Sequence, residues 1–122
     1  MKPANTRGRG QHAEDQAFNF LKRNGLEPLA RNYRTPRGEI DLIMQDNDTI
    51  VFIEVRARAS ADYMATLESI DKRKLNNIIF ASNHYLQKNN RLNDTPCRFD
   101  VVALTGDIHQ PKIEWIKNAF EA

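Results

Sequence analysis

Apolar side chains recur at helical spacing in two segments of the chain. Residues 11–24 carry the first set at intervals of three to four, with Asn24-Gly25 as a stop, namely Ala13, Ala17, Phe18 and Leu21 with Phe20 alongside. A second helix is predicted from Asp71 to Asn89, where one face carries Leu75, Ile78, Ile79, Ser82, Tyr85 and Leu86. Each helix therefore has one apolar face with which to cover a core.

Runs rich in Ile, Val and Phe predict five strands. The two most apolar are Glu39–Gln45 and Thr49–Ala57, separated by an Asp/Asn turn. Leu26–Tyr33 is a weaker strand, expected at a sheet edge because Pro28 interrupts it. The last two predicted strands are Arg98–Leu104 and Lys112–Ile116. The order αβββαββ predicts an α/β fold in which helices flank a mixed β-sheet.

The charged residues are unevenly distributed along the 122 residues. The net charge is only +2, but residues 1–38 hold eight Lys/Arg against three acids, and residues 39–54 hold five acids and no base. We expect residues 1–10 to form a flexible basic arm and residues 11–122 to form a single domain. An acidic centre between basic segments suits a polyanion held by cations around a metal, although solvated charge explains much of the same pattern.

Several classes of protein are not expected. The single cysteine, Cys97, cannot form an internal disulfide, and we expect it to be a small buried hydrophobe rather than a nucleophile. His12, His84 and His109 lack metal-ligand spacing, so a zinc site is not expected. No apolar run approaches a membrane span or a signal peptide, which favours a soluble cytoplasmic protein.

The acidic centre lies on the predicted hairpin of residues 39–57. If Asn47-Asp48 is a two-residue type I′ turn, Asp41 falls opposite Glu54, and Glu39 falls opposite Arg56. Opposite residues share a face of the sheet, with Cβ atoms about 5 Å apart. The hairpin is therefore predicted to hold two carboxylates side by side.

Two such carboxylates repel each other by about 3 kcal/mol at an effective dielectric constant of about 20. A raised pKa, a cationic side chain or a bound divalent metal would each offset this repulsion. Carboxylate oxygens from neighbouring strands match what Mg²⁺ takes from a protein, and substrate phosphate commonly completes its shell. The alternative is a pair of edge carboxylates satisfied by Arg56 and Arg58.

Sequence motifs along most of the chain resemble a known family. Asp41 followed by the Glu-x-Arg of Glu54 and Arg56 resembles a variant of the PD-(D/E)xK signature of restriction-endonuclease-like nucleases. The segments GEIDLI, VFIEVRAR, SIDKRK, RFDVVAL and IEWIKNAF, between Gly10 and Phe120, resemble in this order the YraN-like family of bacterial proteins. That family is similar to archaeal Holliday-junction resolvases. The resemblance implies a restriction-endonuclease-like sheet.

The resemblance also implies roles for individual residues. Asp41 and Glu54 become ligands of Mg²⁺ or Mn²⁺, with the carbonyl of Val55 as a third ligand. Glu14 becomes an acidic residue beside the site, with a solvated helix position as its alternative. Glu39 binds water or a second metal, or pairs with Arg56.

Arg56 is a departure from the superfamily, which has lysine at this position. Arginine stays protonated below pH ~12 and cannot act as a base, but it can hold the scissile phosphate. Proton removal would then fall to metal-bound water. The alternative is a site that has lost hydrolysis and kept binding.

Basic residues near the predicted site are candidates for nucleic-acid contacts. The second predicted helix begins with Lys72, Arg73 and Lys74. The helix dipole disfavours cations at this end, but a helix start with cations and free N–H groups can bind a phosphate. Lys74 falls at the lysine position of the family's corresponding segment. The candidates are Lys74, Lys72, Arg37 and Arg58, with cations extended into solvent as the alternative. Asp100 is expected to pair with Arg98 or to support the site from the next strand, and a structural role is the favoured interpretation.

The sequence therefore predicts a Mg²⁺- or Mn²⁺-dependent endonuclease that hydrolyses DNA, with branched or structured DNA as candidate substrates. The alternative is a nuclease-fold protein that binds nucleic acid or a protein partner without cleaving. RNA is a third, weaker candidate substrate. The resemblance to resolvases allows a symmetric homodimer, because a four-way junction offers two cleavage sites.

Overall fold

A computed structural model describes residues 4–58, 63–91 and 94–121. Its elements are α1 (Ala4–Arg23), β1 (Glu27–Thr35), β2 (Gly38–Asp46), β3 (Thr49–Arg58), α2 (Tyr63–Glu68), α3 (Lys72–Lys88), β4 (Cys97–Thr105) and β5 (Lys112–Phe120). The strands form one sheet in the order β1-β2-β3-β4-β5, and only the β3–β4 pair is parallel. The predicted mixed sheet flanked by helices is confirmed, with the short helix α2 as an addition.

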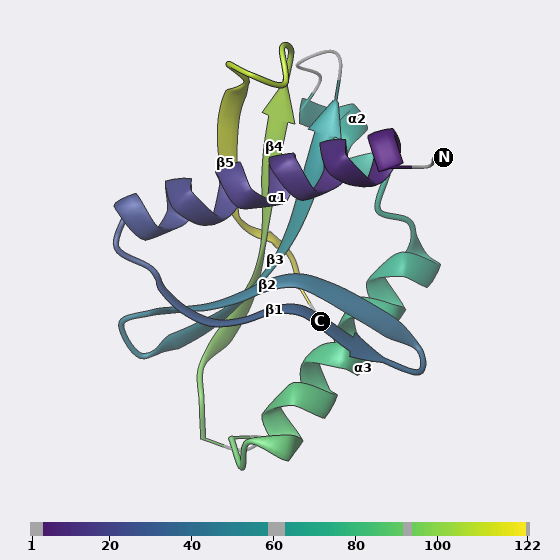
Figure 1. The fold of residues 1–122 in the computed structure, drawn as a ribbon. Coiled ribbons are helices and arrows are strands. Elements are labelled where there is room, and N and C mark those ends of the chain that lie inside the picture. Colours follow the sequence, from purple (N-terminus) through teal and green to yellow (C-terminus); the bar gives the residue numbers. More distant parts are fainter. Residues whose placement is uncertain (1–3, 59–62, 92–93, 122) are drawn as a thin grey trace.

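The two long helices cover opposite faces of the sheet (Figure 1). On one face, α1 contributes Ala13, Ala17 and Leu21 to a cluster with Leu26, Leu42, Met44, Val51, Ile53, Val102 and Leu104. On the other, α3 contributes Ile78, Ala81, Tyr85 and Leu86 to a cluster with Ile40, Ile43, Ile50, Phe52 and Phe99. The central strands therefore bury both faces, which explains their nearly continuous apolar sequences.

Helix α1 begins earlier than predicted. Of the flexible arm predicted for residues 1–10, residues 4–10 form the first turns of α1, and residues 1–3 lie outside the described residues. Extending a helix adds one hydrogen bond per residue without a new nucleation step. The helix formed by the following residues can therefore extend through Gly8 and Gly10, although glycine has a low helix propensity.

The edge strands contain irregularities that the sequence only partly indicated. β1 is an edge strand as predicted, and its pairing with β2 shifts between Pro28 and Ala30, which leaves Leu29 as an extra, exposed residue. β5 continues to Phe120, four residues past the predicted end, because it resumes pairing with β4 after a bulge around Asn118.

The β2–β3 turn has the predicted length but not the predicted type. Asp46 pairs with Thr49, so the turn has two central residues. Asn47 has a φ of 57°, but Asp48 does not have the positive φ that a type I′ turn also requires. The hairpin register does not depend on this difference, because it follows from the turn's length.

Cys97 is exposed, so its prediction as a buried hydrophobe is wrong. It is the first residue of β4, and a strand's first residue can lie outside the core that covers the rest. Partial burial nevertheless raises the pKa of its thiol. A raised pKa disfavours the thiolate, which agrees with the prediction that Cys97 is not a nucleophile.

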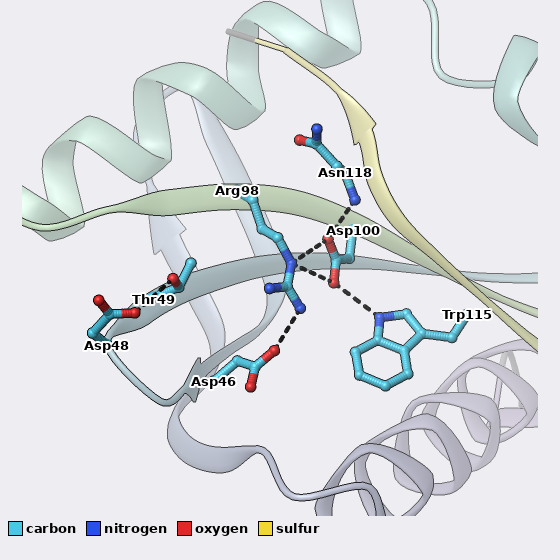
Figure 2. A network of polar contacts seen from close by, with 7 residues as sticks. All are labelled: Asp46, Asp48, Thr49, Arg98, Asp100, Trp115 and Asn118. Atoms are coloured by element: carbon cyan, nitrogen blue, oxygen red, sulfur yellow. Dashed lines mark hydrogen bonds and ion pairs between the residues drawn. The ribbon is translucent and has the colours of Figure 1, made fainter.

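A network of polar contacts lies where β4 meets β5 (Figure 2). Asp100 is fully buried and accepts hydrogen bonds from Arg98 Nε at 3.1 and 3.2 Å, Trp115 Nε1 at 2.9 Å and the Asn118 backbone N–H at 2.8 Å. Arg98 also pairs with Asp46 at 3.0 Å. The predicted pairing of Asp100 with Arg98 is confirmed, and the same carboxylate binds the amide exposed by the β5 bulge.

Gly38, at the start of β2, packs directly against the backbone of α3. A Cβ atom at this position would lie 2.6 Å from the carbonyl oxygen of Asn77. We expect Gly38→Ala to lower the free energy of unfolding by about 1–3 kcal/mol, since backbone must move to admit the methyl group. Chemical denaturation would measure this loss.

Gly10→Ala is a matched control for Gly38→Ala. A Cβ atom at Gly10 meets nothing within 4 Å, and Gly10 lies within α1. This substitution should raise stability by about 0.5–1 kcal/mol, because alanine favours the helix. Equal effects of the two substitutions would contradict the close contact between β2 and α3.

Candidate active site

The candidate site lies where β2 and β3 separate. Their pairing runs from Asp46 opposite Thr49 to Leu42 opposite Ile53, as the predicted register requires. Asp41 is the next residue of β2, and its Oδ2 accepts the backbone N–H of Val55 at 2.9 Å. Where the backbone pairing of β2 with β3 ends, the side chain of Asp41 thus accepts a hydrogen bond from a backbone N–H of β3.

Glu54 lies beside Asp41 and carries most of the site's ion pairs. Its side chain is 7% exposed, and its Oε2 lies 3.2 Å from Arg56 and 3.3 Å from Lys74 Nζ. The charge of Glu54 also acts directly on Asp41, so the two carboxyl groups lie close together. The predicted juxtaposition of Asp41 and Glu54 is therefore present, and Lys74 reaches the pair from the first turn of α3.

The two carboxyl groups hold a proton more tightly than isolated acids. Burial, followed by the charge of Glu54, raises the pKa of Asp41 to about 7. Burial also raises the pKa of Glu54, against the opposing effects of Lys74 and Arg56. Near pH 7, Asp41 therefore exchanges between its neutral and its charged form beside the Glu54 carboxyl group.

Glu14 approaches this pair from α1. It is buried, and its charge contributes to the raised pKa of Asp41. Its Oε1 accepts hydrogen bonds from Arg31 at 3.1 Å and Asn32 Nδ2 at 2.9 Å. Glu14 is therefore a buried acid near the site, and hydrogen bonds from β1 fix its side chain. It is not a solvated helix residue.

The other candidate residues lie around this centre. Glu39 pairs with Arg34 at 3.1 Å and not with Arg56. Lys72 is exposed in the first turn of α3, where the Asp71 side chain caps the helix by accepting the Lys74 N–H. Arg58 is exposed at the end of β3.

Arg37 is also exposed, and its guanidinium lies over the ring of Phe80, 4.7 Å from the centroid. The stacking links the β1–β2 turn to α3, on the same side of the sheet as Lys74. It restricts the orientation of the Arg37 side chain while leaving its charge accessible to an anion.

Arg31 and Asn32 are members of the site that sequence reasoning missed. They reach Glu14 from β1, a strand predicted only weakly and judged peripheral. The sequence offered one signal, which was the presence of two adjacent polar residues, Arg31 and Asn32, in the middle of a strand. This pattern is common on solvent-facing edge strands. In the structure, α1 packs against the sheet and brings the Glu14 carboxylate within hydrogen-bond distance of these two residues.

The donor set suits a cation that keeps most of its own water. Within the described part of the chain, no three His, Cys, Asp or Glu side chains are arranged to enclose a metal ion. Asp41 and Glu54 nevertheless carry an unfavourable pair of charges that a dication would offset. Mg²⁺ is commonly bound through one or two carboxylates with water and substrate phosphate, so the two residues fit this ion.

A family model matches most of the chain. It covers residues 13–104, and its description is uncharacterised protein family UPF0102. The chain belongs to this family. UPF0102 is the YraN-like family to which the sequence motifs pointed, and the match includes Glu14, Asp41, Glu54 and Lys74.

Individual UPF0102 proteins are similar over nearly their full length. One from Pseudomonas putida strain F1 is 48% identical over 122 residues, which is 99% of each chain. One from Pseudomonas entomophila strain L48 is 53% identical over 114 residues, or 92% of each chain. One from Pseudomonas fluorescens strain Pf0-1 is 47% identical over 113 residues, with 93% of this chain and 92% of the relative covered.

The helices of this protein do not have the properties of a membrane span in the part of the chain that the structure describes. In residues 4–58, 63–91 and 94–121, none combines the length and the apolar character needed to cross a bilayer. Helix α1, with 20 residues, has the length but is largely polar.

Proposed function

We propose that this protein is a metal-dependent phosphodiesterase of the restriction-endonuclease-like superfamily that cleaves DNA in the cytoplasm. The observation that carries the proposal is the coupled carboxyl pair of Asp41 and Glu54, with Lys74 and Arg56 in contact with Glu54. Acids whose pKa values are raised by burial and by a neighbouring charge, with cations beside them, are typical of catalytic centres. The resemblance to PD-(D/E)xK nucleases supports the same assignment.

Different residues of the site would have different roles in phosphodiester hydrolysis. Asp41 and Glu54 would hold Mg²⁺ or Mn²⁺, and the Val55 carbonyl stays a predicted third ligand; when bound, the ion lowers the pKa of its water. Arg56 is suited to the substrate phosphate, because its buried Nε has no hydrogen-bond partner among the described residues. Lys74 orients Glu54 and adds positive charge where charge develops on the phosphate.

Basic side chains around this centre support nucleic acid as the substrate. Helix α3 begins with Lys72, Arg73 and Lys74, and it contains no Asp or Glu. Arg37, stacked on Phe80, extends this positive region to the β1–β2 turn. In this proposal the basic side chains contact backbone phosphates. Such contacts give an affinity for nucleic acid that does not depend on base sequence and that falls with increasing salt.

Binding without cleavage is a second candidate function, and Arg56 favours it. Its guanidinium neutralises Glu54 at 3.2 Å and cannot accept a proton from water, unlike the lysine usual at this position. In this alternative, the site would keep its affinity for nucleic acid or a protein partner and lack hydrolysis.

The test is cleavage of plasmid DNA and a synthetic four-way junction in the presence of Mg²⁺ or Mn²⁺. We expect the unmodified protein to cleave, and Asp41→Asn and Glu54→Gln each to lower the rate at least about a hundredfold, because a ligand lost from the site removes most of the electrostatic stabilisation. Asp48→Asn is the matched control. It removes a carboxylate from the same hairpin at an exposed turn position and should leave cleavage unchanged.

Other outcomes separate the two candidates. Salt-sensitive DNA binding without cleavage would support the binding protein, and a gain of cleavage in Arg56→Lys would identify the arginine as the cause. Cleavage that Asp41→Asn and Glu54→Gln leave intact would rule out this site. An RNA panel tests the remaining substrate class, and sedimentation with a four-way junction tests whether a homodimer binds it.

A further inference from the structure

Asn32 lies opposite Asp41 in the pairing of β1 with β2. Arg31 pairs with Leu42 and Tyr33 with Ile40, so the position between them places Asn32 across from Asp41. Asn32 has a φ of 52°, in the left-handed region that a strand residue rarely adopts. A backbone of this kind next to a cluster of charged groups indicates a local requirement of the site.

The β1–β2 hairpin changes faces at this position. Leu42 belongs to the core under α1, whereas Ile40, two residues away, belongs to the core under α3. On the partner strand, Arg31 reaches Glu14 of α1, and Tyr33 packs in the α3 core. Residues two apart in a regular strand share a face, so the hairpin rotates about Asn32 and Asp41.

The side chain of Asn32 makes the second connection. Its Nδ2 donates to Glu14 Oε1 at 2.9 Å, and Arg31 donates to the same oxygen at 3.1 Å. Among the described residues, Glu14 Oε2 has no hydrogen-bond donor, so the two donors fix one oxygen and leave the other available. Asparagine suits both tasks, because it tolerates a positive φ better than most residues and its amide can donate.

We propose that Asn32 is a positioning residue, which holds Glu14 as an outer anion of the site while its left-handed backbone sets the direction of Asp41. Glu14 would then stabilise a divalent cation held by Asp41 and Glu54 through its negative charge. This inference rests on the proposed function for the identity of the cation. The placement of Glu14 by Asn32 does not depend on it.

The decisive variant is Asn32→Gly, which keeps the backbone conformation and removes the amide. Glycine adopts a positive φ readily, so we expect the melting temperature to stay within about 3 °C of that of the unmodified protein. Affinity for Mn²⁺, followed by the paramagnetic resonance signal of the free ion, should fall about tenfold, as for other outer-shell partners of metal sites. The Glu14 carboxyl ¹³C resonance should also shift.

Asn47→Gly is the matched control, since Asn47 has a similar φ of 57° in the β2–β3 turn, away from Glu14. It should change neither Mn²⁺ affinity nor the Glu14 resonance. Unchanged Mn²⁺ affinity in Asn32→Gly would overturn the proposed role. Absence of Mn²⁺ binding by the unmodified protein would overturn the metal site instead, and an unshifted Glu14 resonance in Asn32→Gly would then overturn the placement by Asn32.

Discussion

Asp100→Ala is expected to lower the free energy of unfolding by about 3–5 kcal/mol, the range seen when one partner of a buried ion pair is removed. Asp100 is fully buried and accepts from Arg98, the indole of Trp115 and the Asn118 amide. Without the carboxylate, all three donors lose this acceptor. Among the described residues, Asp46 is then the remaining ion-pair partner of the Arg98 guanidinium. The β5 bulge at Asn118 would also lose the contact that holds it to β4.

Urea denaturation followed by fluorescence would measure this loss, because Trp115 is the chain's only tryptophan and contacts Asp100 directly. Asp46→Asn is the matched control, since it removes the other carboxylate partner of Arg98. The side chain of Asp46 is 27% exposed. We expect it to cost less than about 1 kcal/mol. Equal losses for the two variants would contradict a central role for Asp100.

Asp41→Asn is expected to make the protein more stable than the unmodified chain at alkaline pH, by up to about 4 kcal/mol. The pKa of Asp41 is about 7 in the folded state against an ordinary value of 3.8, because burial and Glu54 disfavour its charged form. Folding therefore takes up a proton between these values. The stability that this proton provides is full below about pH 4 and is lost as the pH rises through 7.

The measurement is the free energy of unfolding of both proteins from pH 4 to pH 9 without divalent ions. The difference between them isolates Asp41 from other titrating groups, and it should grow in favour of Asp41→Asn as the pH rises. Addition of Mg²⁺ at pH 8 should stabilise the unmodified protein and not the variant, because only the folded site binds the ion. A difference independent of pH would contradict the raised pKa.

The proposed nuclease activity and the pH-dependent stability of Asp41 have one origin. A carboxyl pair that costs stability when fully ionised can bind a dication once the proton leaves, so the same charges destabilise the apoprotein and prepare the site. Metal affinity should therefore rise through neutral pH. Lys74 and Arg56 compensate part of the charge on Glu54 and keep the fold tolerant of the pair.

The fold and the central pair of acids could be predicted from local sequence. Periodicity located both long helices and all five strands, and a two-residue turn with alternating faces was enough to place Asp41 beside Glu54. Both inferences depend on short-range geometry, in which a few residues decide direction and register. The exposure of Cys97 was missed, because burial at the end of a strand depends on neighbours distant in sequence. The start of α1 was also missed, because a helix can extend into residues with weak helix propensity once it has formed. The type of the β2–β3 turn was missed as well.

Local sequence was thus enough to specify the two long helices, the five strands, the order of these elements and the two carboxylates that share a site. Only the tertiary structure decided how that site is supported: Lys74 reaches Glu54 from another element, and Arg31 and Asn32 reach Glu14 across a gap of 17–18 residues. It also decided the rotation of the β1–β2 hairpin at Asn32. These features arise when α1 and α3 pack on opposite faces, because long-range burial and charge select conformations that local pattern does not specify.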